Sequence, residues 1–142
     1  MPRIKIQLPD SFGFSCFVPV RITDVNYGGH VGNDAFLSII HEARMQYLQH
    51  HGFTEMQFGG VGMIMSDLAV EFKAELFYGE TIIVSVAPGE ISKAGFELIY
   101  LVEKETAGKK ISVIIAKTGM ICFDYGKKKV VSIPEIALNK LR

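Results

Sequence analysis

Cysteine is scarce in this sequence, and long hydrophobic runs are missing from it. The two cysteines, Cys16 and Cys122, both lie within apolar runs. A disulfide framework or a zinc site would need more cysteines, or partners closer in the sequence, so we expect two buried, reduced thiols in a reducing compartment. No stretch approaches the roughly 18 uninterrupted apolar residues of a membrane helix, and residues 1–8 lack the apolar core of a signal peptide. We therefore expect a cytoplasmic protein that does not span a membrane.

An excess of charge of either sign is also missing. Fifteen basic residues balance fifteen acidic ones, so no overall positive potential attracts nucleic acid or anionic lipid. The sequence contains no repeat, low-complexity tract or linker, and its 142 residues are the length of one domain. Apolar residues make up 49% and charged residues 21%, which is typical of a globular protein. We expect a single domain over residues 1–142.

What the sequence does contain is a change of periodicity along the chain. Apolar residues recur at every second position over residues 12–22, which indicates a half-buried strand. After a glycine-rich turn the period becomes helical over residues 34–49. Asn33 or Asp34 can cap the start of this helix, and Gly52 can end it. The expected apolar stripe consists of Phe36, Leu37, Ile39, Ile40, Ala43, Tyr47 and Leu48.

Alternating apolar patterns return after the helix. Four further strands are expected over residues 68–76, 82–86, 96–102 and 111–123, with a break at Pro88–Gly89 and a turn at 107–110. Short turns between alternating runs imply antiparallel neighbours. A short helix is expected over residues 134–141.

Together these elements predict an α+β fold, in which a curved antiparallel sheet of five or six strands wraps around one long central helix. The outer face of that sheet would still carry apolar residues such as Ile99 and Leu101. Such a face suggests burial against another subunit, and the open sheet edges could pair between subunits.

Three short motifs accompany this order of elements. Residues 21–33 read RITDVNYGGHVGN, the helix carries Glu42-Ala43-Arg44, and residues 70–80 form a strand pattern that ends in a Gly-Glu turn. These motifs resemble those of hotdog-fold acyl-CoA thioesterases of the 4-hydroxybenzoyl-CoA thioesterase type, whose loop contains Asp-x-Asp and Gly-His-Val-x-Asn and whose helix contains Glu-x-Ala-Arg. The likeness covers roughly residues 12–125, and the loop and helix motifs together make it fairly specific.

The resemblance implies hydrolysis of a thioester between an acyl group and coenzyme A or an acyl carrier protein. It also implies homodimers or homotetramers with active sites at the subunit boundary. No cofactor is expected, because coenzyme A is part of the substrate, and no metal-ligand spacing occurs in the sequence. The pair His50-His51 is interpreted as a partner of the helix dipole.

Thioester hydrolysis requires stabilisation of the oxyanion that forms on the carbonyl. Unpaired backbone N–H groups at a helix N-terminus supply this. We expect Gly29, Gly32 and Asn33 to bind substrate here, with N–H groups near Gly32 and Asn33 polarising the carbonyl, since glycines allow close approach of a ligand to the backbone. The alternative is that these glycines only form a tight turn.

The reaction also requires a base or nucleophile, usually a carboxylate. The family's second loop aspartate corresponds here to Asn26, whose amide can hold a water or a carbonyl but cannot act as a base. Glu42 is the leading substitute, because its interval from His30 matches the His and Glu of plant acyl-carrier-protein thioesterases. It lies roughly 13 Å along the helix from Asn33, however, and it can equally be a structural carboxylate paired to an arginine.

Two further residues of the loop are catalytic candidates. Asp24 corresponds to the first aspartate of the motif, which in the family more often braces the loop. His30 can orient water or hold the backbone by a hydrogen bond. Asp67 is expected at the start of a strand, where a solvated edge position is favoured over chemistry, and Lys127–Lys129 are expected in a solvated turn.

An apolar pocket would provide acyl specificity. Its candidate lining residues, which can equally be ordinary core, are Phe36, Met45, Phe58, Met63 and Met65. Three functions remain open: a thioesterase, a hotdog protein that binds an acyl thioester without hydrolysing it because Asn26 replaces the aspartate, and, less favoured, a dehydratase that uses His30 with Glu42.

Overall fold

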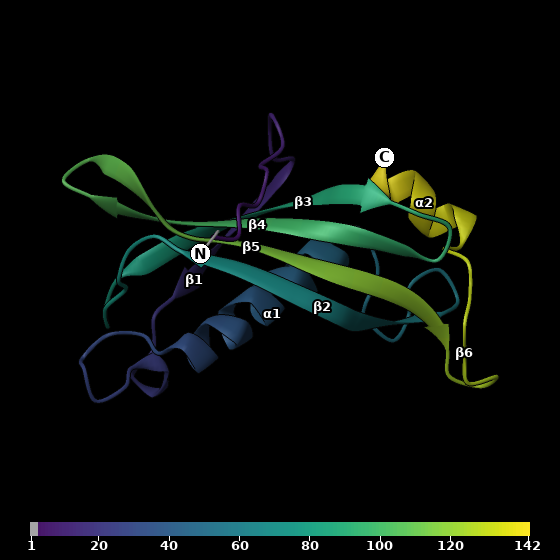
Figure 1. The fold of residues 1–142 in the computed structure, drawn as a ribbon, viewed down its shortest axis with the longest axis horizontal. Helices are drawn as coiled ribbons and strands as arrows, with labels where there is room; N and C mark the ends of the chain where they lie inside the picture. Colours follow the sequence, from purple (N-terminus) through teal and green to yellow (C-terminus); the bar gives the residue numbers. More distant parts are fainter. Residues whose placement is uncertain (1–2) are drawn as a thin grey trace.

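The structure, a computed structural model, describes residues 3–142. One long helix, α1 (Asn33–His50), lies across one face of an antiparallel sheet, and a short helix, α2 (Glu135–Leu141), packs at the far end (Figure 1). A 3-10 turn over Ile22–Asp24 and the glycine-rich turn connect the first strand to α1. The predicted α+β arrangement is confirmed.

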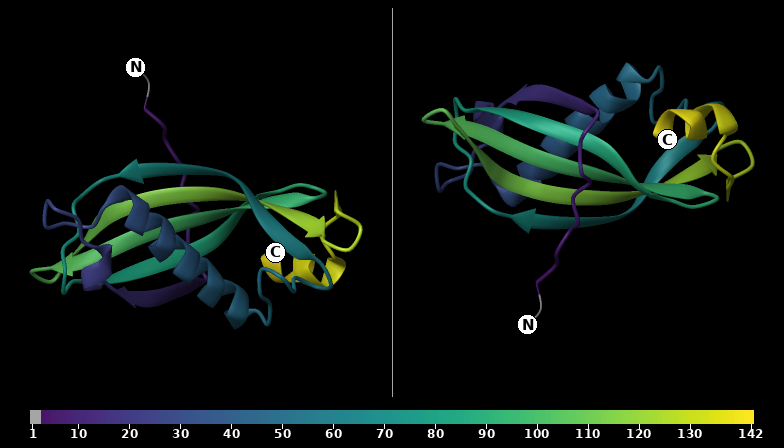
Figure 2. Two further views of the ribbon diagram at one scale, coloured as in Figure 1. Left: turned by 90° about the horizontal axis from the view of Figure 1, so that it is seen from below. Right: turned by 90° about the horizontal axis from the view of Figure 1, so that it is seen from above.

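The sheet contains six strands, and its main path runs in the order β1-β3-β4-β5-β2. Their bounds are β1 (Phe14–Pro19), β2 (Gly62–Phe72), β3 (Thr81–Ile91), β4 (Gly95–Thr106), β5 (Lys109–Asp124) and β6 (Lys129–Val130), and β6 pairs only with β5. All pairings are antiparallel. Figure 2 shows the sheet curving around α1.

Two predicted features of the strands are wrong. The break at Pro88–Gly89 is a shift of register inside β3, which continues to Ile91. Asp67 does not start a strand, since it lies inside β2 beside a second register shift. Bulges of this kind accommodate residues that do not fit regular pairing, so a strand passes through them.

The helix α1 is held by its apolar face. Its buried residues include most of the predicted stripe, but Leu37 is 48% exposed and was wrongly included. The N-cap is Gly32, so Asn33 and Asp34 are already inside the helix and do not cap it. Gly52, at φ +85°, follows the C-cap His51 as predicted, and its N–H donates to the carbonyl of Gln49 at 2.9 Å.

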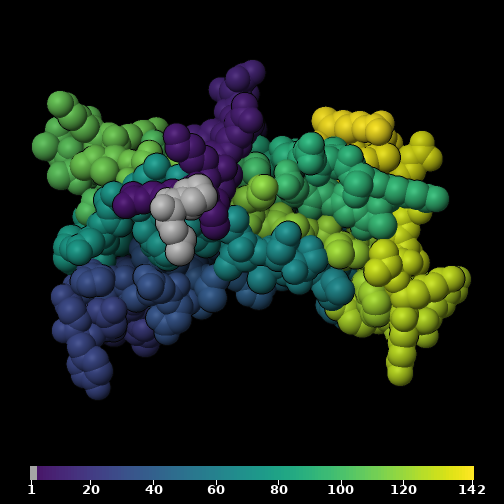
Figure 3. Space-filling view, in the orientation of Figure 1, coloured from purple at the N-terminus to yellow at the C-terminus, as the bar shows by residue number. Residues whose placement is uncertain are grey.

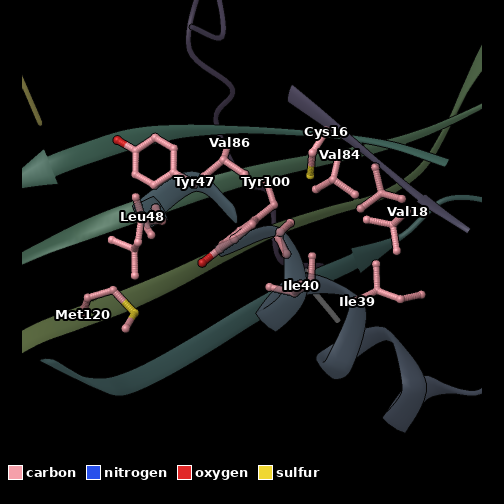
Figure 4. Packing of buried hydrophobic residues seen from close by; sticks show 14 of the residues in the cluster. Cys16, Val18, Ile39, Ile40, Tyr47, Leu48, Val84, Val86, Tyr100 and Met120 are labelled. Carbon is pink, nitrogen blue, oxygen red and sulfur yellow. The ribbon is translucent and has the colours of Figure 1, made fainter. Parts of the chain in front are cut away.

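The main core lies between α1 and the inner face of the sheet (Figure 4). One charged side chain from α1, that of Arg44, is buried there: its Nη1 donates to the Tyr100 hydroxyl at 3.3 Å, and that hydroxyl lies 2.7 Å from Oγ1 of Thr118. Both cysteines are buried and free, as expected. Burial raises the pKa of the Cys122 thiol to about 11.

The outer face of the sheet is covered differently from the prediction. The N-terminal segment, residues 3–13, crosses this face, as Figures 2 and 3 show. Its Ile6 packs with Ile99 and Ile115, so that Ile99 is only 4% exposed without a second subunit. The Ile6 N–H donates to Oε2 of Glu71 at 2.7 Å. In the described residues, no helix is long and apolar enough to cross a membrane.

Candidate active site

The second half of the glycine-rich turn is hydrogen-bonded to the connection between β2 and β3. The N–H of Val31 donates to the carbonyl of Leu76 at 2.7 Å, and His30 forms an isolated bridge with Phe77. Inside the turn, the Gly29 N–H donates to the carbonyl of Asn26 at 3.1 Å. Gly29 takes φ +80°, a conformation that side chains disfavour. These hydrogen bonds hold the turn in one conformation, and they thereby fix the position at which α1 begins.

Asn26 faces the start of the helix from across this turn. Its Oδ1 accepts the N–H of Gly28 at 2.9 Å, which orients the side-chain amide. A methyl group at position 32 would lie 3.3 Å from its Nδ2. Nδ2 therefore lies close to Gly32, at the N-terminus of α1.

Two backbone N–H groups at the start of α1 have no hydrogen-bond acceptor among the described residues. The Gly32 N–H, one of the expected carbonyl donors, instead donates to the carbonyl of Asp24 at 3.2 Å. The N–H groups of Asn33 and Asp34 have no partner among residues 3–142. Free amides at this position carry the positive end of the helix dipole. The amide expected at Asn33 is therefore available, and a second one at Asp34 joins it.

Asp34 also belongs to this site, although the sequence analysis did not predict a chemical role for its carboxylate. A methyl group at position 32 would come within 2.8 Å of its Oδ1. The carboxylate of Asp34 and the Nδ2 of Asn26 therefore flank the same glycine. The signal was in the sequence, because an acidic residue directly follows Asn33, but that residue was interpreted only as a helix cap.

Asp24 is buried and turned towards the preceding backbone. Its Oδ2 accepts the N–H of Arg21 at 2.9 Å, and Oδ1 lies 3.5 Å from Nη2 of the same residue. Both carboxylate oxygens and the backbone carbonyl are thus engaged within residues 21–32. This geometry matches a brace for the loop.

His30 is half-buried under the turn. Its Nδ1 lies 3.3 Å from the carbonyl oxygen of Val31, and its ring packs against Gly28. These contacts hold the turn together. They correspond to the hydrogen bond to the backbone that the sequence left open as one role for this residue.

Glu42 lies on the exposed face of α1, two turns beyond Asp34. Its Oε2 accepts a hydrogen bond from Nε2 of Gln46 at 2.7 Å. Its partner is therefore an amide, not the arginine that the structural alternative invoked. The arginine of the Glu-Ala-Arg motif, Arg44, is paired instead with Glu55 at 3.4 Å, and this pair links α1 to the loop before β2.

A cleft of about 420 Å³ runs between β1 and the outer face of α1. It brings Asp24 and Glu42 to one cavity, with Phe17, Ile39 and Met45 as apolar lining. Asn26, Gly29, His30 and Asn33 are absent from its lining and gather at the turn. The candidate residues therefore form two neighbouring groups, one at the turn and one along the helix.

The expected acyl-pocket residues divide in the same way. Met45 lines the cleft, whereas Phe36, Phe58 and Met63 belong to the core and Met65 is exposed on β2. Across residues 3–142 no group of His, Cys, Asp or Glu is arranged to hold a metal ion.

Comparison with known proteins places this geometry in a family. The sequence matches the thioesterase-like superfamily over residues 20–141. A candidate esterase of Aquifex aeolicus (strain VF5) is 29% identical over 125 residues, which cover 87% of this chain and 93% of that protein.

Solved structures share the architecture at lower sequence identity. The 4-hydroxybenzoyl-CoA thioesterase of Pseudomonas sp. strain CBS-3 has a TM-score of 0.79 at 14% identity, covering 91% of this chain and 99% of the other. A 1,4-dihydroxy-2-naphthoyl-CoA thioesterase of Synechocystis also has a TM-score of 0.79, at 19% identity, covering 90% and 94%. At such identities the likeness shows the hotdog fold alone. Because the family match spans most of the sequence, the chain belongs to the thioesterase-like superfamily.

Proposed function

We propose that this protein is a thioesterase that hydrolyses an acyl-CoA, or acyl-carrier-protein, thioester to a free acid and a thiol. The observation that carries the proposal is the pair of unpartnered N–H groups of Asn33 and Asp34 at the start of α1. Family membership supports the reaction class, and the two CoA thioesterases named above support a CoA ester as substrate. The reaction needs no cofactor besides the coenzyme A of the substrate.

In this reaction the carbonyl oxygen of the thioester accepts hydrogen bonds from the two amides. Water attacks the carbonyl carbon and gives a proton to a carboxylate, so the developing oxyanion is stabilised by the helix N-terminus. The C–S bond then breaks, and the leaving thiolate takes the proton back. Asn26 cannot accept that proton, but its Nδ2 is placed to hold the water or the carbonyl.

Two carboxylates compete for the role of base. Asp34 adjoins the free amides and lies beside Asn26 across Gly32. Glu42 is roughly 12 Å further along the helix, so it reaches a carbonyl at Asn33 only from a second subunit. Asp24 is engaged with Arg21. Within one subunit, Asp34 is the carboxylate in reach.

A second subunit is part of the proposal. β2 forms one end of the main path of the sheet, and its exposed side chains include Ile64, Met65 and Phe72. An open strand of this length with apolar side chains is suited to pairing with another chain. We propose a homodimer or homotetramer of a single 142-residue domain, located in the cytoplasm and without nucleic acid or membrane as partners.

The decisive experiment measures thiol release by the full chain from a panel of aromatic and aliphatic acyl-CoAs and acyl carrier proteins. We expect turnover by the unaltered protein. Asp34→Asn should lower kcat at least about 100-fold if Asp34 is the base, with KM little changed. Glu42→Gln should produce that loss instead if the base comes from the neighbouring subunit. Asp10→Asn, which removes an exposed carboxylate in the N-terminal segment, is the matched control.

The alternative function is binding without hydrolysis, and the amide at Asn26 is the observation that favours it. Saturable binding of an acyl-CoA with no thiol release from any substrate of the panel would replace the thioesterase proposal by this one. Release that is unaffected by both Asp34→Asn and Glu42→Gln would leave the reaction standing and remove both assignments of the base.

A further inference from the structure

Both ends of the loop between β1 and α1 are hydrogen-bonded to the same segment, the connection between β2 and β3. At the start of the loop, the Val20 N–H donates to the carbonyl of Glu80 at 3.0 Å. At its end, the Val31 N–H donates to the carbonyl of Leu76 at 2.7 Å. Figure 2 shows this connection running past the start of α1. The place at which the helix begins therefore depends on the position of residues 75–80.

Lys104, on β4, contacts this connection at three points. Its Nζ donates to the carbonyl of Glu75 at 2.7 Å and lies 3.2 Å from Oε2 of Glu80. The same Nζ lies over the ring of Phe77, at 5.2 Å from the ring centroid. The Phe77 N–H in turn donates to Oε1 of Glu80 at 2.6 Å. One ammonium group therefore joins the beginning, the middle and the end of residues 75–80.

Burial distinguishes this ion pair from a more exposed one on the same sheet. The Lys104 side chain is 12% exposed, whereas that of Lys117, whose Nζ also lies 3.2 Å from a glutamate, is 38% exposed. Solvent screens a partly buried charge less, and a charged donor forms a stronger hydrogen bond than a neutral one. Exposed ion pairs contribute little. We therefore expect Lys104 to restrict the connection more than Lys117 restricts its strand.

We propose that Lys104 is a positioning residue for thioester hydrolysis. By holding residues 75–80, it fixes both ends of the loop before α1. That loop places Asn26 beside the free N–H groups of Asn33 and Asp34. This role rests on the thioesterase function proposed above, and Lys104 does not itself touch the substrate. Loss of its ammonium would let the loop shift, and a small misplacement of positioned groups lowers kcat more than it changes substrate binding.

Hydrogen exchange of single backbone N–H groups in the full chain tests this contact without any substrate. Lys104→Met keeps the aliphatic part of the side chain and removes the ammonium. In this variant the Val20 and Val31 amides should exchange about tenfold faster than in the unaltered protein. Lys104→Arg, which keeps the charge and the donors, should restore slow exchange. Lys117→Met, which breaks the ion pair of equal length with Glu97, is the matched control and should leave both amides unchanged.

The kinetics of thiol release test the consequence for the reaction. Lys104→Met should lower kcat about tenfold with KM little changed, Lys104→Arg should recover most of this loss, and Lys117→Met should keep full kcat. A merely structural role would lower the melting temperature of Lys104→Met without altering kcat or Val31 exchange where the variant is folded. The proposal is overturned if either quantity is unchanged in Lys104→Met, or if Lys117→Met alters both equally.

A second variant serves if Lys104→Met does not fold. Glu80→Gln keeps an acceptor for the Phe77 N–H and removes the charge that pairs with Lys104, so it should change exchange and kcat in the same directions. If the unaltered protein releases no thiol from any thioester, the thioesterase proposal fails by itself. Exchange of the Val31 amide then still decides whether Lys104 holds the loop, and the affinity for an acyl-CoA takes the place of kcat.

Discussion

Gly32 determines how closely Asn26 and Asp34 approach the first free amide of α1. With Gly32→Ala, the new methyl group would meet Asp34 Oδ1 at 2.8 Å and Asn26 Nδ2 at 3.3 Å. We expect kcat for thiol release to fall by about tenfold or more, because displacement of positioned groups impairs catalysis. The melting temperature should change little, since the exposed Asp34 carboxylate can move. An alanine variant with full kcat would contradict the proposed placement of these groups.

The buried polar chain from Arg44 to Thr118 makes a prediction about stability. Tyr100→Phe would leave Arg44 Nη1 and Thr118 Oγ1 without the hydroxyl that joins them. We expect a loss of about 2 kcal/mol in the free energy of unfolding, as for buried polar groups that lose a partner. Urea denaturation measures it. Tyr125→Phe, at a half-exposed ring, serves as the control, and equal losses in the two variants would count against the polar chain.

For single residues, the sequence predicts which residue types form the site better than it predicts which of their hydrogen-bonding groups are free to bind a substrate. Asn26, His30 and Asn33 could be placed in one turn because they are close in the chain. The use of the Gly32 amide by Asp24 could not be predicted, since it depends on how the 3-10 turn folds back. The hydrogen-bond partner of Glu42 could have been predicted from the sequence, because Gln46 follows it by one helical turn.

Among the elements, α1 depends on a specific ending. Gly52 has φ +85° and nothing within 4 Å of the position of a β-carbon, so only the backbone conformation resists a side chain there. Gly52→Ala should therefore lower the free energy of unfolding by about 1 kcal/mol. Gly13→Ala has equally open space and no positive φ, and it should be nearly neutral. Thermal denaturation of both variants checks this, and an equal effect would point away from the helix ending.

The strands show which signals in the sequence are reliable. Alternation predicted the centres of β1, β3 and β4, and β5 was predicted as the strand that follows the turn at 107–110. The start of β2 was missed because Met63, Ile64 and Met65 form a continuous apolar run, and the bulge at Ser66 then changes the phase of the alternation. Its predicted end at Leu76 was too long, since β2 stops at Phe72 and the N–H groups of Lys73 and Ala74 both reach the carbonyl of Val113.

For the whole molecule, the attachment of the N-terminal segment is predicted to depend on pH. The Ile6 N–H and the nearby Lys73 lower the pKa of Glu71. A carboxylate with a lowered pKa in the fold stabilises it above the unfolded pKa of about 4.3 and loses this effect as pH falls through the folded value. Glu71→Gln should therefore lower the melting temperature at pH 7, and the difference from the unaltered protein should shrink below about pH 4.

The control for this prediction is Glu105→Gln, at an exposed carboxylate beside the β4–β5 turn, which should show no such convergence. Hydrogen exchange at pH 7 provides a second measurement, since the Ile6 amide should exchange faster in Glu71→Gln. Unchanged exchange would mean that the segment is held by its apolar contacts with Ile99 and Ile115 alone.

The position of this segment could not be predicted, because its contact with the sheet joins residues 65 positions apart. The apolar outer face was recognised, but its cover was assigned to another chain. The long helix and the antiparallel sheet were predicted correctly, since each follows from local periodicity and short turns. The expectation that strands joined by short turns are neighbours is wrong for β2, which pairs with β5 and not with β3.

The N-terminal segment also restricts the routes of assembly. Two sheets can stack through their outer faces only where those faces are uncovered. In this protein the N-terminal segment already covers the middle of the outer face. Association of two dimers must therefore use the face that carries α1, or the N-terminal segment must first detach from the outer face of the sheet. Tetramer formation in the second case would become sensitive to truncation of the first dozen residues, while formation of the edge-paired dimer would not.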